Sequence, residues 1–209
     1  MRAAIIHPSL RAIVFDFNGV IAEDETPHFL AFQQALGEDR FQLTKEDYYG
    51  RYLGMDERNC LNAILTEITG HPDPVREQSI HERKAVLFRA HMARHTPPLF
   101  PGVVDLVAHA GQRYRLAIAT GGRREQILFA LSGTPIEKTF DALVSAEDVA
   151  VGKPYPDVYL HTLDRLNETR RPSESPLVAD ECLVIEDSLA GITSALAAGM
   201  KVLAVATTY

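Results

Sequence analysis

Three acidic side chains and one lysine, spread over the whole chain, are the residues whose types suggest chemistry. Asp16 lies in the apolar run AIVFDF, Lys153 lies in a Gly-Lys-Pro stretch, and Glu186-Asp187 closes the apolar run CLVIE. Carboxylates a few ångströms apart repel one another strongly, so a shared site requires a cation. A hard divalent ion with oxygen ligands would neutralise them, and Mg²⁺ is the usual one beside phosphate. These residues therefore favour a phosphoryl-transfer site with Asp16 as the nucleophile.

Such a site also needs groups that hold the phosphate. The stretch Thr120-Gly121-Gly122 follows the apolar run YRLAIA, and we expect Thr120 to start a helix there. A hydroxyl and the free backbone N–H groups of a helix start can bind a phosphate, and Lys153 adds a point charge to the same group. We therefore take Thr120 and Lys153 as catalytic candidates, and Gly121 and Gly122 as candidates for contact with the substrate.

Each of these residues also has a simpler explanation when it is taken alone. Thr120 can be a plain helix cap, Lys153 a solvated loop residue, and Glu186-Asp187 a pair of turn residues. What favours a common site is that all of them follow successive strands of one predicted sheet. The carboxyl ends of parallel strands open onto one crevice, where open α/β sheets bind their ligands.

The elements that must position these residues follow from the periodicity of the sequence. Residues 12–17 predict a strand buried on both faces, which the turn signal Asn18-Gly19 closes. From residue 101 onward, helices and strands alternate, as is typical of an α/β fold with a parallel sheet. The expected strands cover 114–119, 141–145, 182–186 and 201–206, and the expected helices cover 102–111, 123–132, 156–167 and 189–199.

Between residues 22 and 97 the pattern is helical throughout. Helices are expected over 26–36 with Thr26 as N-cap, over 44–53 with a Thr44–Asp47 capping box, over 56–69, and from 75 to about 95. The third should bury one face and end at Gly70; that face holds Cys60, Leu61, Ile64, Leu65 and Ile68. Helices that cannot join a parallel sheet are best placed above the strand ends. We therefore expect a core of residues 1–21 and 98–209 and an inserted all-helical cap of residues 22–97.

Composition and charge argue against several classes of partner. The net charge is −7 and there is no long basic run, so nucleic acid is not expected as a partner. No apolar stretch reaches the roughly 18 residues of a membrane span, so no membrane partner is expected, and MRAAIIHPSL does not have the form of a secretory signal. Cys60 and Cys182 lie far apart and give no sign of an oxidising compartment. We expect a cytoplasmic protein with a small phosphorylated substrate; the sequence leaves its oligomeric state open.

The order of the motifs resembles that of the haloacid dehalogenase (HAD) superfamily. The motifs are Asp-x-Asn-Gly-Val from Asp16, Thr120, Gly-Lys-Pro-x-Pro-Asp from Gly152, and Ile-Glu-Asp-Ser-x-Ala-Gly from Ile185. They are most similar to the β-phosphoglucomutase/phosphatase-like branch, in which a helical cap follows the first motif. The likeness covers nearly the whole chain, and the last two motifs are specific.

This resemblance implies a Rossmann-like core and an aspartyl-phosphate formed on Asp16. It implies that Mg²⁺ is held by Asp16, by the main-chain carbonyl of Asn18 and by Asp187, with Glu186 in support. Thr120 and Lys153 would then bind the transferring phosphoryl group.

Position 18 departs from the pattern of the phosphatases that the chain resembles. They carry a second aspartate there, which protonates the leaving group and later activates water. An amide cannot exchange a proton at neutral pH, so Asn18 lacks general acid–base catalysis worth ~10²–10⁴-fold. Three explanations stay open: His28, at a position where the mutase branch also has histidine, takes over the role; the substrate has a good leaving group, such as an acyl phosphate; or Asn18 was introduced to trap a complex.

The leading prediction is a Mg²⁺-dependent hydrolase of a small phosphorylated metabolite. A catalytically weak binder of phosphorylated ligands, which keeps the metal and phosphate sites, is one alternative. A phosphonatase-type hydrolase would need a cap lysine, for which Lys45 and Lys84 are the candidates, and Glu186-Asp187 argues against a dehalogenase because that reaction needs no Mg²⁺. A sugar-phosphate mutase is disfavoured because Leu53 and Glu57 stand where that enzyme has basic residues.

Overall fold

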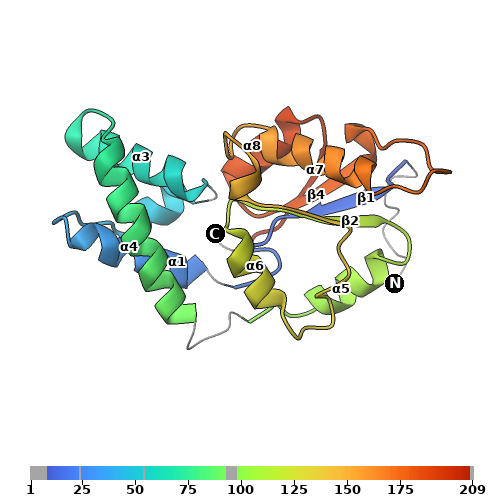
Figure 1. Ribbon diagram of the computed structural model, residues 1–209, viewed down its shortest axis with the longest axis horizontal. Coiled ribbons are helices and arrows are strands. Elements are labelled where there is room, and N and C mark those ends of the chain that lie inside the picture. Colours follow the sequence, from blue (N-terminus) through green and yellow to red (C-terminus); the bar gives the residue numbers. More distant parts are fainter. Residues whose placement is uncertain (1–8, 24, 54, 93–97, 208–209) are drawn as a thin grey trace.

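A parallel sheet of five strands forms one part of the molecule (Figure 1). The computed structural model describes residues 9–23, 25–53, 55–92 and 98–207. The strand order is β3-β2-β1-β4-β5, so the first strand lies at the centre. The strands are β1 (Ala12–Phe15), β2 (Arg115–Ala119), β3 (Ala142–Val144), β4 (Cys182–Glu186) and β5 (Lys201–Ala204). The predicted α/β fold with a parallel sheet is therefore confirmed.

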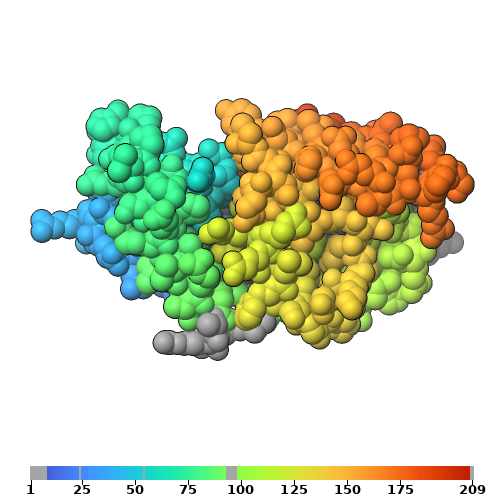
Figure 2. Space-filling view, in the orientation of Figure 1, coloured from blue at the N-terminus to red at the C-terminus, as the bar shows by residue number. Residues whose placement is uncertain are grey.

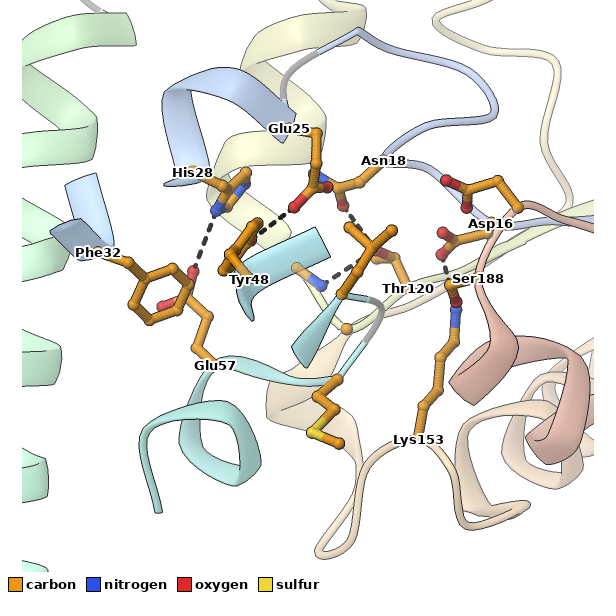
Figure 3. Close-up of a pocket in the computed structure, with 15 residues that line it drawn as sticks. Asp16, Asn18, Glu25, His28, Phe32, Tyr48, Glu57, Thr120, Lys153 and Ser188 are labelled. Carbon is orange, nitrogen blue, oxygen red and sulfur yellow. Dashed lines mark hydrogen bonds and ion pairs between the residues drawn. The ribbon is translucent and has the colours of Figure 1, made fainter. Parts of the chain in front are cut away.

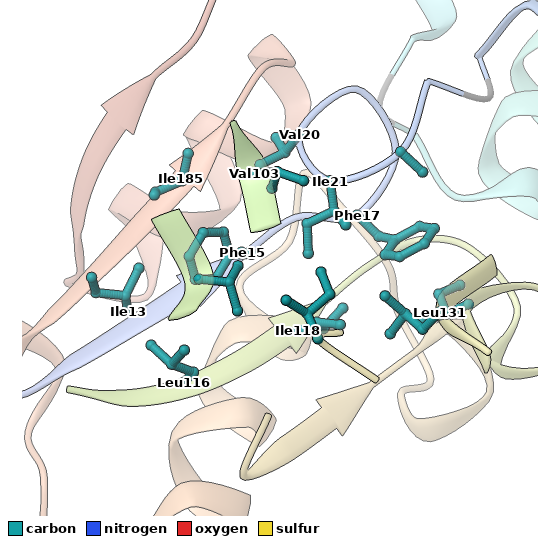
Figure 4. Close-up of a cluster of buried hydrophobic side chains, with 14 of the residues drawn as sticks. Ile13, Phe15, Phe17, Val20, Ile21, Val103, Leu116, Ile118, Leu131 and Ile185 are labelled. Carbon is teal, nitrogen blue, oxygen red and sulfur yellow. The ribbon is translucent and has the colours of Figure 1, made fainter. Parts of the chain in front are cut away.

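Helices cover both faces of this sheet, in agreement with the predicted burial of the first strand on both sides. The side chains of Ile13 and Phe15 of β1 lie on one face of the sheet, which α5 (Val103–Ala110) and α6 (Arg124–Leu131) cover. Figure 4 shows this cluster. The side chains of Ala12 and Val14 lie on the opposite face, which α7 (Asp157–Glu168) and α8 (Leu189–Ala197) cover. Burying a side chain such as Phe15 contributes roughly 1.5–3 kcal/mol to stability.

The helical segment between β1 and α5 forms a second lobe with its own apolar core (Figure 1). The expected inserted cap is confirmed. Its elements are α1 (Glu25–Gly37), α2 (Lys45–Asp47), the π-helix η1 (Tyr48–Tyr52), α3 (Glu57–Thr69) and α4 (Pro74–Met92). In the core lobe, two short 3₁₀ helices, η2 (Ala146–Asp148) and η3 (Ala179–Glu181), precede α7 and β4.

Most of the predicted helix signals in the cap are confirmed, and two are wrong. The Thr44 hydroxyl accepts a hydrogen bond from the Asp47 amide at 3.0 Å, and Gly70 ends α3 with a φ of +79°. Thr26 is not an N-cap, because α1 already includes Glu25. Ile68 is 47% exposed, since the buried stripe of α3 ends at Leu65 and the cap core extends no further along the helix. The expected end of the fourth helix near residue 95 lies outside the described residues.

Two segments of chain connect the lobes, and they run side by side. Ala22 pairs with Leu99 in an antiparallel bridge, the Glu23 amide donates to the Pro98 carbonyl at 3.0 Å, and the Phe100 amide donates to the Ile21 carbonyl at 3.0 Å. Figure 2 shows the cap, in blue to green, lying against the yellow-to-orange surface of the core. The lobe limits at residues 22 and 97 stay a prediction; residue 97 lies outside the described part. Within that part, no helix has the length and apolar character needed to span a membrane.

Candidate active site

The register of the sheet brings acidic residues of two neighbouring strands together. Phe15 of β1 lies opposite Ile185 of β4, so the next residue in each strand, Asp16 and Glu186, follows at the same edge. The Asp16 amide donates to the Ile185 carbonyl at 3.0 Å, which extends the pairing by one step. Both side chains are buried, with 5% and 0% of their surfaces exposed. The predicted meeting of the first and fourth strand ends is thus present in the structure.

Lys153 lies between these carboxylates and balances part of their charge; Figure 3 shows it beside Asp16. Its ammonium is 2.7 Å from Asp16 Oδ1 and 2.6 Å from Glu186 Oε1. Burial alone would raise the pKa of Glu186, but the nearby Lys153 charge outweighs burial and the pKa is lowered. Burial also disfavours the charged lysine, yet the two carboxylates raise its pKa well above the usual value. Lys153 and Glu186 are therefore a buried ion pair.

Asp16 is the second carboxyl group that contacts Lys153, and its pKa is shifted in the opposite direction. Burial raises the pKa of its carboxyl group to about 8, against the lowering effect of Lys153 and with the help of the Glu186 and Asp187 charges. The single positive charge of Lys153 thus does not balance the negative charges of Asp16, Glu186 and Asp187. Asp16, Glu186 and Asp187 each offer a carboxylate oxygen, and these oxygens lie within 4.8 Å of one another. Buried oxygen donors with excess negative charge fit a hard divalent cation such as Mg²⁺.

Glu186 is held in place from the start of α8. The amide and hydroxyl of Ser188 donate to Glu186 Oε2 at 2.8 and 3.0 Å, and the Tyr159 hydroxyl donates to Oε1 at 3.1 Å. A Cβ atom at Gly191 would lie 1.6 Å from Glu186 Oε1, so only glycine leaves room for this carboxylate. These contacts fix the orientation of Glu186 before any ligand binds.

Thr120 follows β2 and faces Asn18 across the crevice. Its hydroxyl donates to Asn18 Oδ1 at 3.2 Å and accepts from the Gly122 amide at 3.0 Å. Thr120 does not start a helix, contrary to our expectation: α6 begins at Arg124 with Arg123 as its N-cap. The two intervening glycines form a turn, and Gly121 and Gly122 line the same pocket as Thr120 and Asp16. Backbone amides of this turn, rather than of a helix start, border the pocket.

The cap supplies the opposite wall of this pocket, and sequence reasoning missed most of its residues. Glu25, Phe32, Tyr48, Leu53 and Glu57 line it together with His28 (Figure 3). The Tyr48 hydroxyl donates to Glu25 Oε1 at 2.5 Å. An acidic residue in the first turn of a helix usually complements the helix dipole, so no signal in the sequence marked Glu25 as a pocket residue.

His28, the substitute for the missing aspartate in one of the three open explanations, belongs to a buried network in the cap. Its Nδ1 is 2.7 Å from the Lys84 ammonium, and its ring stacks on Phe88 with centroids 4.1 Å apart. Burial and the Lys84 charge lower the pKa of His28 to about 3, so it is neutral. Lys84, fully buried, is also paired with Glu57. Burial raises the pKa of Glu57, but Lys84 outweighs burial and lowers it.

The cap meets the core most closely at Asp56, the N-cap of α3. Its Oδ1 accepts from the amides of Arg58 and Asn59, both at 3.1 Å. A Cβ atom at Gly152 would lie 2.2 Å from Asp56 Oδ2, and one at Gly121 would lie 3.4 Å from Asp56 Cα. Gly152 therefore allows the start of α3 to approach the loop that carries Lys153, whereas a Cβ atom at Gly121 would only be in van der Waals contact with Asp56.

The match to a protein-family model covers residues 13–205 and carries the description haloacid dehalogenase-like hydrolase. The chain is 30% identical over 195 residues to a phosphorylated carbohydrates phosphatase of Thermotoga maritima, and the match covers 92% of this chain and 83% of that protein. It is 28% identical over 197 residues to the β-phosphoglucomutase of Bacillus subtilis, covering 91% of this chain and 81% of that protein. A crystal structure of a protein CbbY variant from Rhodobacter sphaeroides, in complex with xylulose-(1,5)bisphosphate, has a TM-score of 0.77 and 29% identity, covering 93% and 85% of the two chains.

Proposed function

The chain belongs to the haloacid dehalogenase-like hydrolases, in the branch that includes protein CbbY and β-phosphoglucomutase, and we propose that it is a Mg²⁺-dependent phosphatase of a small sugar phosphate. It is a hydrolase of phosphoric monoesters. The observation that carries the proposal is the convergence of Asp16, Glu186 and Asp187 around the Lys153 ammonium. An enclosed acid cluster with one compensating cation is costly to bury unless it serves a ligand.

In this proposal Asp16 is the nucleophile and Lys153 its neutralising partner. One oxygen of Asp16 attacks phosphorus and forms an aspartyl-phosphate, and water then hydrolyses it to release phosphate. Lys153 contacts Asp16 Oδ1 in the free enzyme, and it is positioned to meet the phosphoryl oxygens as they approach. Thr120 and the amides of Gly121 and Gly122 complete the phosphate site.

Asp16, the main-chain carbonyl of Asn18 and Asp187 would hold Mg²⁺, and Glu186 would support them. When bound, the ion neutralises charge on the phosphoryl group as it transfers. The departing group lies on the cap side, since attack and departure are in line and Asp16 attacks from the core. The cap residues that line the pocket would therefore determine the specificity for the alcohol part of the substrate.

The proposal for a sugar phosphate is supported by the relatives and by the cap wall. One relative is named for phosphorylated carbohydrates and another was crystallised with a sugar bisphosphate. The wall offers two carboxyl groups, one phenol and one imidazole, from Glu25, Glu57, Tyr48 and His28. Groups of this kind form hydrogen bonds with the hydroxyls of a sugar.

The test is a panel of sugar phosphates and simpler phosphate esters, assayed with and without Mg²⁺. We expect turnover that needs Mg²⁺ and that Asp16→Asn reduces to background, while Asp105→Asn, the same change at an exposed site on α5, leaves it unaltered. Binding of inorganic phosphate without turnover of any ester would indicate a phospho-ligand binder instead. Trapping of a carbonyl substrate by borohydride would indicate a Schiff base and a phosphonatase-type reaction.

A further inference from the structure

We propose that Glu25 is the general acid and base of this site, in place of the aspartate that position 18 lacks. The inference rests on the proposed phosphatase function and adds the group that moves the proton. Hydrolysis of a sugar phosphate expels an alkoxide, which is a poor leaving group unless it is protonated as it departs. Asn18 cannot supply that proton, so another residue must.

The direction of attack restricts where the acid can lie. Asp16 approaches phosphorus from the carboxyl edge of the sheet, so the leaving oxygen points away from the core and toward the cap. Four titratable cap residues among the described ones line the pocket: Glu25, His28, Tyr48 and Glu57. The proton donor is expected to be one of these four.

Three of the four are committed to other contacts. Glu57 is paired with the fully buried Lys84 and lies 3.1 Å from His81 Nε2. The Lys84 ammonium contacts His28 Nδ1, and the low pKa of His28 keeps its ring neutral, so it carries no extra proton to give to a leaving group. Tyr48 is buried, and its hydroxyl donates a hydrogen bond to Glu25. Of the two cap carboxyl groups that line the pocket in the described part of the chain, Glu57 is in an ion pair with Lys84 and Glu25 is not.

The position of Glu25 fits the role. It is the first residue of α1, directly after the connection from the core, and its side chain projects into the pocket on the side of Asn18 and Thr120 (Figure 3). The Tyr48 hydroxyl fixes Oε1, so a proton on the carboxyl group resides on Oε2. A general acid needs such a fixed orientation toward the reacting oxygen.

The charges around Glu25 allow it to serve in both steps. The pKa of this carboxyl group is raised to about 7: burial is the main cause and the Asp16 and Glu57 charges add to it, while Tyr48 and Lys84 act in the opposite direction. Both protonation states are therefore present at neutral pH. Efficient general acids and bases have pKa values close to the working pH.

The proton balance of the reaction closes with Glu25 alone. As Asp16 forms its bond to phosphorus and the bond from phosphorus to the leaving oxygen breaks, Glu25 gives its proton to that oxygen and an alcohol departs. Glu25, now a carboxylate, takes a proton from the water that attacks the aspartyl-phosphate. The bond between Asp16 and phosphorus breaks, phosphate leaves, and Glu25 again carries its proton.

The test compares two leaving groups in Glu25→Gln. On the sugar phosphate that the unaltered enzyme hydrolyses best, we expect kcat to fall about 10²-fold or more with little change in KM, because protonation of the alkoxide is lost. With 4-nitrophenyl phosphate, whose leaving group needs no proton, the initial burst of nitrophenolate should keep its rate within a few-fold. Glu23→Gln, the same change at an exposed site two residues earlier, is the control and should match the unaltered enzyme on both substrates.

A second variant keeps the outcome clear if Glu25→Gln also disturbs the cap. Adding Asn18→Asp to Glu25→Gln restores a carboxyl group at the other position, and we expect it to recover most of the lost kcat. Turnover that Asp16→Asn abolishes but Glu25→Gln leaves unchanged would overturn the role of Glu25 and keep the phosphatase. A fall in the burst rate with 4-nitrophenyl phosphate as large as the fall in kcat on the sugar phosphate, or no recovery in the double variant, would also overturn it. No turnover of any ester by the unaltered chain would overturn both proposals.

Discussion

Lys153 is the residue on which the charge balance of the site depends. It is 1% exposed, and its ammonium contacts one oxygen of Asp16 and one of Glu186. Removing one partner of a buried ion pair leaves the other charge unpaired in a medium that solvates it poorly. Since the second cation expected here is a metal ion, the lysine and the metal should compensate for one another.

We therefore predict that Lys153→Met lowers the free energy of unfolding of the metal-free protein by about 3–5 kcal/mol at pH 7. Added Mg²⁺ should return part of this loss, because it supplies positive charge to the same carboxylates. Urea unfolding with and without Mg²⁺ measures both effects. Lys138→Met, at an exposed site, is the matched control; a loss no greater than in that variant would contradict the central role of Lys153.

The proton on Asp16 should compete with the metal. Because the pKa of this carboxyl group is raised to about 8, the free enzyme holds a proton there at pH 6 and 7, and Mg²⁺ must displace it. The apparent affinity for Mg²⁺ should rise roughly tenfold from pH 6 to pH 7 and level off above pH 8. Titration calorimetry at these pH values tests this. In Asp16→Asn this contribution to the pH dependence should vanish, and an unaltered slope there would assign the proton to another group.

At the scale of elements, the sequence predicts best what depends on local periodicity. β4 was expected over 182–186 and spans those residues. A short apolar run between turn signals is typical of a buried strand in an α/β protein. The range expected for α6, 123–132, agrees with its bounds to within one residue, but Thr120 does not start this helix; a threonine before two glycines looks like an N-cap when the turn that follows is unknown. Lys84 lies in a polar helical stretch, and only the packing of α4 on α1 and α3 shows that it is buried.

The approach of α3 to the core gives a prediction about the cap. Gly152→Ala would place a methyl group against Asp56 Oδ2, so the start of α3 could not come as close to Thr120 and Lys153. We predict that kcat/KM falls on the order of 10–10²-fold, because the cap wall is displaced from the phosphoryl group. Steady-state kinetics measures this, and the midpoint of thermal unfolding should change little.

Gly37→Ala is the matched control for that variant, since a Cβ atom at Gly37 has no neighbour within 4 Å. Its activity should equal that of the unaltered enzyme. If Gly152→Ala also kept full activity, close contact between Asp56 and the core would not be needed for turnover.

At the scale of the whole molecule, the absence of any strand pattern between residues 22 and 97 was enough to predict an inserted helical cap. The face that the cap turns toward the core could not be predicted in the same way. It depends on the paired segments at Ala22 and Leu99 and on the close approach of Asp56 to Gly152. For that reason the core residues of the site were identified from sequence, whereas Glu25 and Tyr48 were found only in the structure.

The division of the site between two lobes leads to the last prediction. Phosphate and Mg²⁺ would bind to core residues, but closure over them involves the cap, so binding should slow amide hydrogen exchange in both lobes. We expect slower exchange at Gly122 beside the phosphate and at Arg58 and Asn59 at the start of α3, measured with Mg²⁺ and inorganic phosphate together. In Gly152→Ala the effect at Gly122 should remain and the effect at α3 should be lost, because the lobes can no longer meet closely. Protection limited to the core in the unaltered protein would mean that the cap does not respond to phosphate, and that the alcohol part of the substrate is needed to bring the lobes together.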